Sequence, residues 1–161
     1  MEYLNELLKK IGALKIYYKG CTENEIEQVE LNIANGKLPN CYKEFLEYFG
    51  KDMDRTPGND RGYLVGNSVF FDDLSDNSEE NGLSGLLEED ESELEIPNKA
   101  FIFYGSQDIL YAFFKLDEGD NPPIYGYAEG YKGETFPVIS ENLSQFYEDY
   151  LDGKRIFNKL Y

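Results

Sequence analysis

Apolar residues recur at helical spacing in the first part of the chain, with polar residues between them. Leucine and isoleucine positions three or four residues apart over residues 4–11 predict a first amphipathic helix, ended by Gly12. Thr22 and Glu25 then form a T-x-x-E capping box, in which each side chain can bond a free backbone N–H of the other residue. This box predicts the start of a second helix, which Gly36 ends.

The stretch LPNCYKEFLEYFG, residues 38–50, predicts a third helix directly after the second. Pro39 suits the first helical position, because its fixed φ is already helical and its missing N–H is not needed there. Gly50 can adopt the left-handed conformation that commonly ends a helix. The apolar and aromatic side chains of this stretch share one face and are expected in the core: Leu38, Tyr42, Phe45, Leu46 and Phe49.

From residue 63 onward, near the middle of the chain, the pattern changes to that of strands. An acidic segment, residues 72–95, is expected to form a loop and then a helix. Asn142 can cap a final helix with apolar residues at helical spacing, which Gly153 ends. Runs of β-branched and aromatic residues bounded by turn residues predict strands at residues 63–65, 68–71, 100–104, 109–116, 124–127 and 136–139.

The order of these elements predicts the fold class. Helices first, then a strand meander and then a closing helix indicate an α+β domain. We expect a largely antiparallel sheet of about four to six strands, packed against the N-terminal and C-terminal helices. No repeat and no linker-like stretch divides the sequence, so a single domain over residues 1–161 is expected.

The charge balance indicates which partners are compatible with the surface. The chain has 32 Asp and Glu against 15 Lys and Arg, a net charge of −17, so it repels nucleic acid and anionic membranes and attracts basic proteins. Hydrophobic residues make up 41% of the sequence, which is enough to build a core, so the acidity belongs to a folded surface rather than to disorder. We expect a basic protein partner, no nucleic acid and no membrane; the sequence leaves the oligomeric state open.

The composition also argues against common enzyme chemistry. There is no histidine, which removes the commonest general base and the commonest transition-metal ligand. Cys21 and Cys41 form no C-x-x-C pair and resemble small buried residues of a reducing compartment. No leader, membrane-length apolar run, P-loop or nucleophile elbow is present. We therefore expect a cytoplasmic protein that is not an enzyme and has no catalytic residues, metal or cofactor.

The acidic segment is the main candidate for a functional surface. It contains eleven carboxylates, and no basic residue lies between Arg61 and Lys99. Two interpretations remain open: a solvated surface, or an interface that steers a basic partner. A Tyr-rich stretch, residues 125–131, is the alternative contact face. The predicted partner-binding residues are Asp72, Asp73, Asp76, Glu88, Glu89, Asp90 and Glu91.

Two short motifs match known binding patterns and are set aside. Residues 77–88 have the spacing of a calcium loop, with Gly82 at the sixth position and Glu88 at the twelfth. However, the loop would start with Asn77, and acidic runs produce such matches by chance. Pro122, Pro123 and Tyr125 spell PPxY, a ligand pattern for WW domains. Because this tyrosine falls in an alternating apolar run, we interpret it as a strand residue.

Three segments, taken in order, resemble the SUKH superfamily. They are TENEIEQVELNIANGKLPNCYKEFLEYFGK, IPNKAFIFYGSQDILYAFFKLDEGDNPPIYGYAEG and VISENLSQFYEDYL, within residues 22–151. The first supplies a helix, Leu-Pro, a second helix and Gly; the others supply the strand meander and the closing helix. No single motif is diagnostic, and the specificity lies in their order and spacing. This chain has Phe49-Gly50 where many relatives place Asn-Gly.

The resemblance implies a non-catalytic immunity protein that binds and neutralises a cognate toxin, often a nuclease or a deaminase. A basic toxin would suit the net acidic charge. A regulatory or scaffold module of the kind that controls fungal cell-wall glucan synthesis is the alternative. An enzyme that works through carboxylate pairs is a third interpretation, but with 32 acids the presence of such pairs carries no information.

Overall fold

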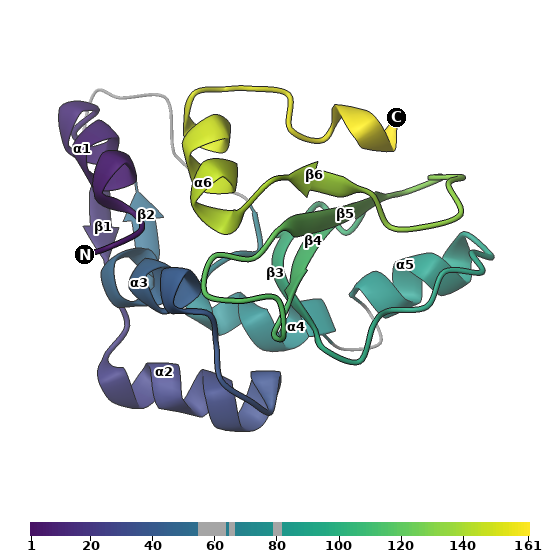
Figure 1. The fold of residues 1–161 in the computed structure, drawn as a ribbon, viewed down its shortest axis with the longest axis horizontal. Coiled ribbons are helices and arrows are strands. Elements are labelled where there is room, and N and C mark those ends of the chain that lie inside the picture. Colours follow the sequence, from purple (N-terminus) through teal and green to yellow (C-terminus); the bar gives the residue numbers. More distant parts are fainter. Residues whose placement is uncertain (55–63, 65–66, 79–81) are drawn as a thin grey trace.

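The computed structural model describes residues 1–54, 64, 67–78 and 82–161. It is an α+β fold in which a strand meander follows the N-terminal helices and precedes a closing helix, as the sequence predicts (Figure 1). The helices are α1 (Asn5–Ala13), α2 (Glu23–Val29, continued by a π-helical turn, Glu30–Ala34), α3 (Asn40–Phe49), α4 (Leu74–Ser78, after a 3₁₀ turn, Phe71–Asp73), α5 (Leu83–Glu89) and α6 (Leu143–Leu151), followed by a last 3₁₀ turn, Asn158–Leu160. The strands are β1 (Tyr17–Lys19), β2 (Asp52–Asp54), β3 (Ala100–Ser106), β4 (Leu110–Lys115), β5 (Ile124–Ala128) and β6 (Val138–Ser140).

The described strands form two antiparallel sheets. The larger has the order β3-β4-β5-β6, a simple meander, and confirms the predicted antiparallel topology. Its strand positions alternate between two buried faces: Phe101 and Phe103 belong to the core with α3 and α6, whereas Ile102 packs with α5. Figure 1 shows the sheet in the middle, with α3 and α6 on one side and α5 on the other. Both faces are apolar because both are covered.

The aromatic face of α3 lies in the core, as predicted. Tyr42, Phe45 and Phe49 are fully buried. The Phe45 ring stacks on the Tyr147 ring of α6, with centroids 4.3 Å apart and planes within 4° of each other. The Tyr42 ring contacts the Phe101 ring of β3 at 5.3 Å. These contacts make α3 the link between the closing helix and the sheet.

The ends of α3 differ from the prediction. Pro39 is the N-cap, with extended ψ, and the first helical residue is Asn40. Gly50 has φ −67°, which is right-handed, so the predicted left-handed cap is wrong. Glycine is required there for another reason: a Cβ would lie 2.7 Å from Sγ of Cys21 and 2.7 Å from Cα of Leu46. Close packing against Cys21 and against the last turn of α3, not a left-handed conformation, selects this glycine.

The first two helices also end differently from the prediction. Gly12 lies inside α1, which continues through Ala13. The π-helical turn after α2 ends at Ala34 and is capped by Asn35, whose φ of 50° is left-handed, so the helix ends before the predicted Gly36. Asparagine tolerates this conformation better than most residues.

The predicted caps at helix starts are confirmed. The Glu25 N–H donates to Oγ1 of Thr22 at 3.2 Å, and the Thr22 N–H donates to the Glu25 carboxylate at 2.8 Å, which completes the capping box. At α6 the Gln145 N–H donates to Oδ1 of Asn142 at 2.9 Å.

Most predicted strands of the meander are confirmed, with the last one shifted to β6. Residues 68–71 are not a strand; beside them Asn67 forms one isolated bridge to Ser106, and a 3₁₀ turn begins at Phe71. In the predicted strand at residues 63–65, positions 63 and 65 lie outside the described residues. The β1–β2 pair was missed because the residues of β1 are all exposed and show no apolar alternation.

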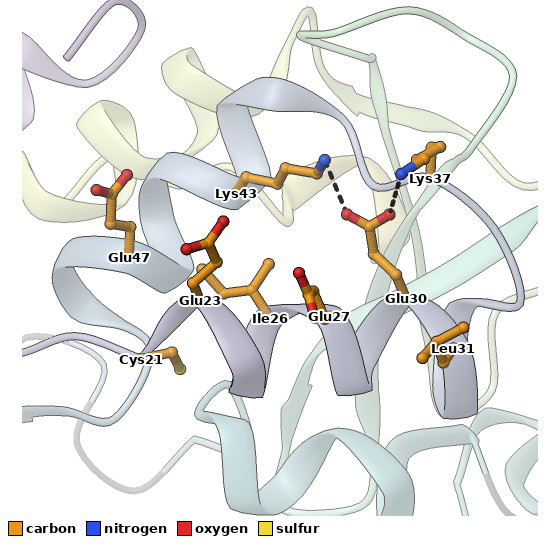
Figure 2. A pocket seen from close by; sticks show the side chains of 9 residues that line it. All are labelled: Cys21, Glu23, Ile26, Glu27, Glu30, Leu31, Lys37, Lys43 and Glu47. Carbon is orange, nitrogen blue, oxygen red and sulfur yellow. Dashed lines mark ion pairs between the residues drawn. The ribbon is translucent and has the colours of Figure 1, made fainter.

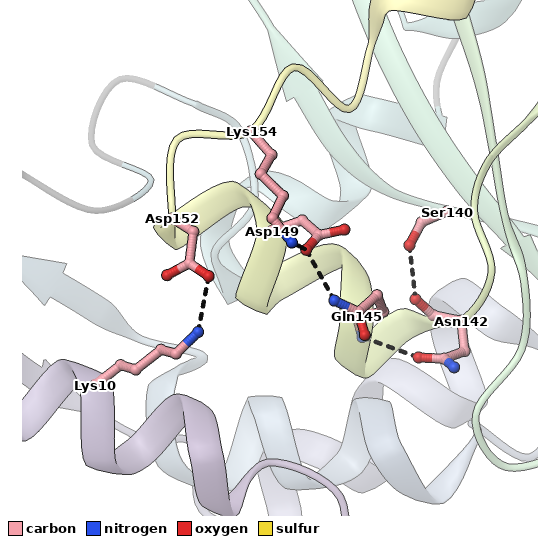
Figure 3. A network of polar contacts seen from close by, with 7 residues as sticks. All are labelled: Lys10, Ser140, Asn142, Gln145, Asp149, Asp152 and Lys154. Atoms are coloured by element: carbon pink, nitrogen blue, oxygen red, sulfur yellow. Dashed lines mark hydrogen bonds and ion pairs between the residues drawn. The ribbon is translucent and has the colours of Figure 1, made fainter.

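One ion pair links the closing helix to α1, and further polar contacts lie at the end of the closing helix itself (Figure 3). Nζ of Lys10 lies 2.8 Å from the Asp152 carboxylate. The Asp149 carboxylate accepts hydrogen bonds from Gln145 at 2.8 Å and from Lys154 at 2.7 Å. Because both side chains of the Lys10–Asp152 pair are partly exposed to solvent, the pair contributes about 1 kcal/mol at most. The buried rings of Phe146 and Tyr147 pack α6 against the core.

None of the helices in the described part of the chain combines the length and apolarity that a bilayer crossing requires.

Candidate partner-binding surface

The structure separates the predicted acidic site into two groups. Asp72, Asp73 and Asp76 lie on the 3₁₀ turn and on α4, against β3. The other four, Glu88, Glu89, Asp90 and Glu91, lie at the far end of α5. Figure 1 shows α5 extending away from α4, so the two groups of predicted residues lie on separate elements.

The three aspartates of the first group differ in how far they are exposed to solvent. Asp72 and Asp76 are exposed, whereas Asp73 is half-buried. Burial raises the pKa of Asp73, and the neighbouring Asp72 and Asp76 carboxylates raise it further. Only the two exposed carboxylates are therefore readily available to a partner.

In the second group Asp90 has a structural role. The Tyr127 hydroxyl donates to its carboxylate at 2.6 Å, and the Gly130 N–H donates at 2.8 Å. The hydrogen bond from Tyr127, followed by that from Gly130, lowers the pKa of Asp90. Burial, together with the hydrogen bond to Asp90, raises the pKa of Tyr127 to about 12. Glu88, Glu89 and Glu91 remain exposed.

These hydrogen bonds join the end of α5 to β5 and to the loop between β5 and β6. The C-terminal part of the acidic segment and the Tyr-rich stretch, which the sequence presented as alternative contact faces, therefore lie side by side. We call residues 88–95 and 125–136 together the acidic–aromatic face. Two hollows open on it, of about 530 Å³ and about 490 Å³, and both are lined by Glu93, Leu94 and Glu134.

The larger of these hollows has aromatic walls. Phe113 stacks on Tyr125 with ring centroids 5.3 Å apart and contacts Phe136 edge-on at 5.1 Å. Nζ of Lys115 lies 4.7 Å from the centroid of the Tyr125 ring, so the protein's own lysine makes a cation–π contact with this wall. Carboxylates of Glu93, Glu95 and Glu134 belong to the same lining. The arrangement suits a basic or aromatic side chain of a partner.

Three of these acidic residues, Glu93, Glu95 and Glu134, were missing from the predicted site. The sequence ESELE, residues 91–95, could have indicated two of them, because its glutamates alternate with other residues as exposed positions of an extended segment do. In the structure each of these glutamates is exposed and the two residues between them are half-buried. Glu134 carries no comparable signal, because only the fold brings it to this face.

The two motifs that were set aside have clear structural contexts. Tyr125 of the PPxY sequence lies in β5, and its hydroxyl donates to Glu118 at 2.9 Å, which agrees with the strand interpretation. Asn77, the first residue of the calcium-like loop, is buried and its side-chain N–H donates to the Ser68 carbonyl at 2.6 Å. Residues 79–81 of that loop lie outside the described residues. Over the residues that are described, no cluster of three Cys, Asp or Glu side chains is placed to hold a metal ion.

The fold and its exposed features define the class of protein. It is an α+β domain whose helices cover both faces of an antiparallel meander and leave acidic loops at the periphery. The family model of the SMI1 / KNR4 family (SUKH-1) matches residues 20–149, and the chain belongs to this family. The SUKH resemblance is thereby confirmed. No curated protein matches the chain.

Proposed function

We propose that this protein is an immunity protein that binds and neutralises a basic toxin, with a nuclease or a deaminase as the expected target. The observation that carries the proposal is the acidic–aromatic face on a SUKH domain. Enzymes that act on nucleic acid bind phosphates through lysine and arginine, so their active-site clefts are basic. Carboxylates at the end of α5 would occupy the positions that phosphates otherwise take. The binding would take place in the cytoplasm and would need no cofactor.

Binding of this kind has a long-range and a short-range part. The net charge of −17 accelerates encounter with a basic protein, and salt screens that attraction beyond about 8 Å at physiological strength. At contact, a few buried anchors provide most of the affinity. The aromatic hollow formed by Phe113, Tyr125 and Phe136 is the best candidate to receive such an anchor.

The test combines protection with kinetics. Co-expression with the toxin encoded beside its gene should restore growth, and the purified pair should bind. Reversing Glu88, Glu89 and Glu91 to Lys should lower the association rate about tenfold at low salt, with a smaller effect at high salt. A stopped-flow series on parent and variant measures this rate.

A charge-matched control reverses exposed acids on another part of the molecule: Glu2, Glu6 and Glu141. Its association rate should fall less than that of the α5 variant, since net charge changes equally but the local field at the interface does not. Equal rates in both variants, or rates independent of salt, would contradict the electrostatic route. Absence of both protection and binding would refute the immunity function and favour a scaffold role.

A further inference from the structure

A separate groove lies between α2 and α3, at the opposite end of the molecule from the end of α5 (Figures 1 and 2). Its volume is about 800 Å³, larger than either hollow on the acidic–aromatic face. One wall is a face of α2 on which glutamates recur at Glu23, Glu27 and Glu30. This spacing of four and three residues places all three on the same side of a helix. The other wall, on α3, carries Lys43 and Glu47.

Apolar groups line the groove between the charged walls. Ile26 is half-buried and Cys21 is buried. Burial raises the pKa of the Cys21 thiol to about 11, so it stays neutral at physiological pH. Leu31, at one end of the groove, is 67% exposed, so its side chain is accessible to a partner. An apolar strip bordered by carboxylates is typical of a site for an amphipathic segment.

The protein's own lysines already bind at one end of the groove. Nζ of Lys43 lies 2.8 Å from the Glu30 carboxylate, and Nζ of Lys37 lies 3.7 Å from it; Figure 2 shows both converging on it. Glu23, Glu27 and Glu47 are exposed and have no ion pair within the residues that the structure describes. One end of the groove is therefore neutralised, and the other remains negative.

We propose that this groove is a second docking site, which binds a lysine- or arginine-rich amphipathic segment of a protein partner. Basic side chains of the segment would pair with Glu23, Glu27 and Glu47, and an apolar side chain would pack on Ile26 and Leu31. Charge complementarity selects this occupant: another copy of a chain with net charge −17, or a nucleic acid, would be repelled. The inference rests on the groove alone and does not require the toxin.

Binding of a defined peptide tests the proposal. The probe is a helical peptide with lysines on one face and leucines on the other, titrated into isotope-labelled protein and followed by NMR. Chemical-shift changes should concentrate on residues 21–31 and 43–47. A peptide with the same lysines but serines in place of the leucines should bind more weakly, because it cannot use the apolar strip.

Two variants localise the contact. Glu27→Lys with Glu47→Lys should weaken peptide binding about tenfold, because two close charge pairs become repulsive. Glu2→Lys with Glu141→Lys adds the same charge at exposed positions elsewhere and should change the affinity less than about twofold. Melting curves check that both variants fold. Three results would each overturn the proposal: an equal loss of peptide affinity in both variants, chemical-shift changes spread over the whole surface, or no peptide binding at all.

The toxin experiment has an independent outcome. Peptide binding in the groove together with failure of toxin protection would refute the immunity function and leave the docking site standing. If the toxin binds in a way that depends on Glu88, Glu89 and Glu91 and no peptide binds in the groove, the docking site is refuted and the immunity function stands.

Discussion

Truncation of Phe45 tests the packing that holds α3, α6 and the sheet together. Its ring is fully buried and lies flat against Tyr147, with centroids 4.3 Å apart. It also contacts Phe49 at 5.8 Å and Tyr42 at 6.1 Å. Phe45→Ala would leave a cavity bordered by three large aromatic rings, none of which can move into the space without losing its own contacts.

The expected cost follows from this geometry. Removing a fully buried phenylalanine costs about 3–5 kcal/mol, the sum of lost transfer free energy and the cavity left behind. The parallel stack on Tyr147 places the value in the upper part of that range, since aromatic pairs contribute about 0.5–1.5 kcal/mol beyond area burial. For a domain of this size, each kcal/mol lowers the melting temperature by about 2–4 °C. We therefore expect a fall of about 8–20 °C.

Thermal and urea unfolding of parent and variant measure the effect. Phe45→Leu, which fills part of the cavity, should fall between the parent and Phe45→Ala. Tyr161→Ala is the matched control, because it removes an aromatic ring that is 82% exposed and should leave the melting temperature unchanged. A Phe45→Ala protein that melts within a degree or two of the parent would refute the assignment of this face to the core.

Three further predictions concern a cap, a titrating group and metal dependence. Thr22→Ala removes the Oγ1 acceptor of the capping box and should cost about 1 kcal/mol in urea unfolding, whereas Thr22→Ser should restore most of it. The pKa of Asp90 is lowered in the folded protein, so its ionised carboxylate stabilises the fold. That contribution to the free energy of unfolding is fully present above the usual carboxyl pKa and is lost as pH falls through the folded pKa. Asp90→Asn should therefore lower the urea midpoint at pH 7 but not at a pH below that folded pKa, and an equal loss at both would contradict the mechanism. The melting temperature should be the same with chelator and with added calcium, and a clear rise with calcium would revive the loop at residues 77–88 as a metal site.

The sequence by itself determined the elements whose signals are local. Thr22 and Glu25 are three residues apart, so the capping box that they form depends on little beyond themselves. The aromatic face of α3 and the runs that became β3, β4 and β5 are likewise set by residues within one element, because periodicity records which side must be buried. The order of these elements was enough to predict an α+β fold and the SUKH family.

Only the tertiary structure decided features that depend on distant partners. Part of the crowding that requires glycine at position 50 comes from the distant Cys21, and the exposed strand β1 exists because β2 pairs with it. Asp90 and Tyr127 are 37 residues apart, and their hydrogen bond is what joins the acidic segment to the Tyr-rich stretch. The α2–α3 groove likewise combines two helices whose separate patterns each describe an ordinary amphipathic helix. A local pattern specifies which face of an element is buried, whereas the position of one element against another is set by the packing of the whole core.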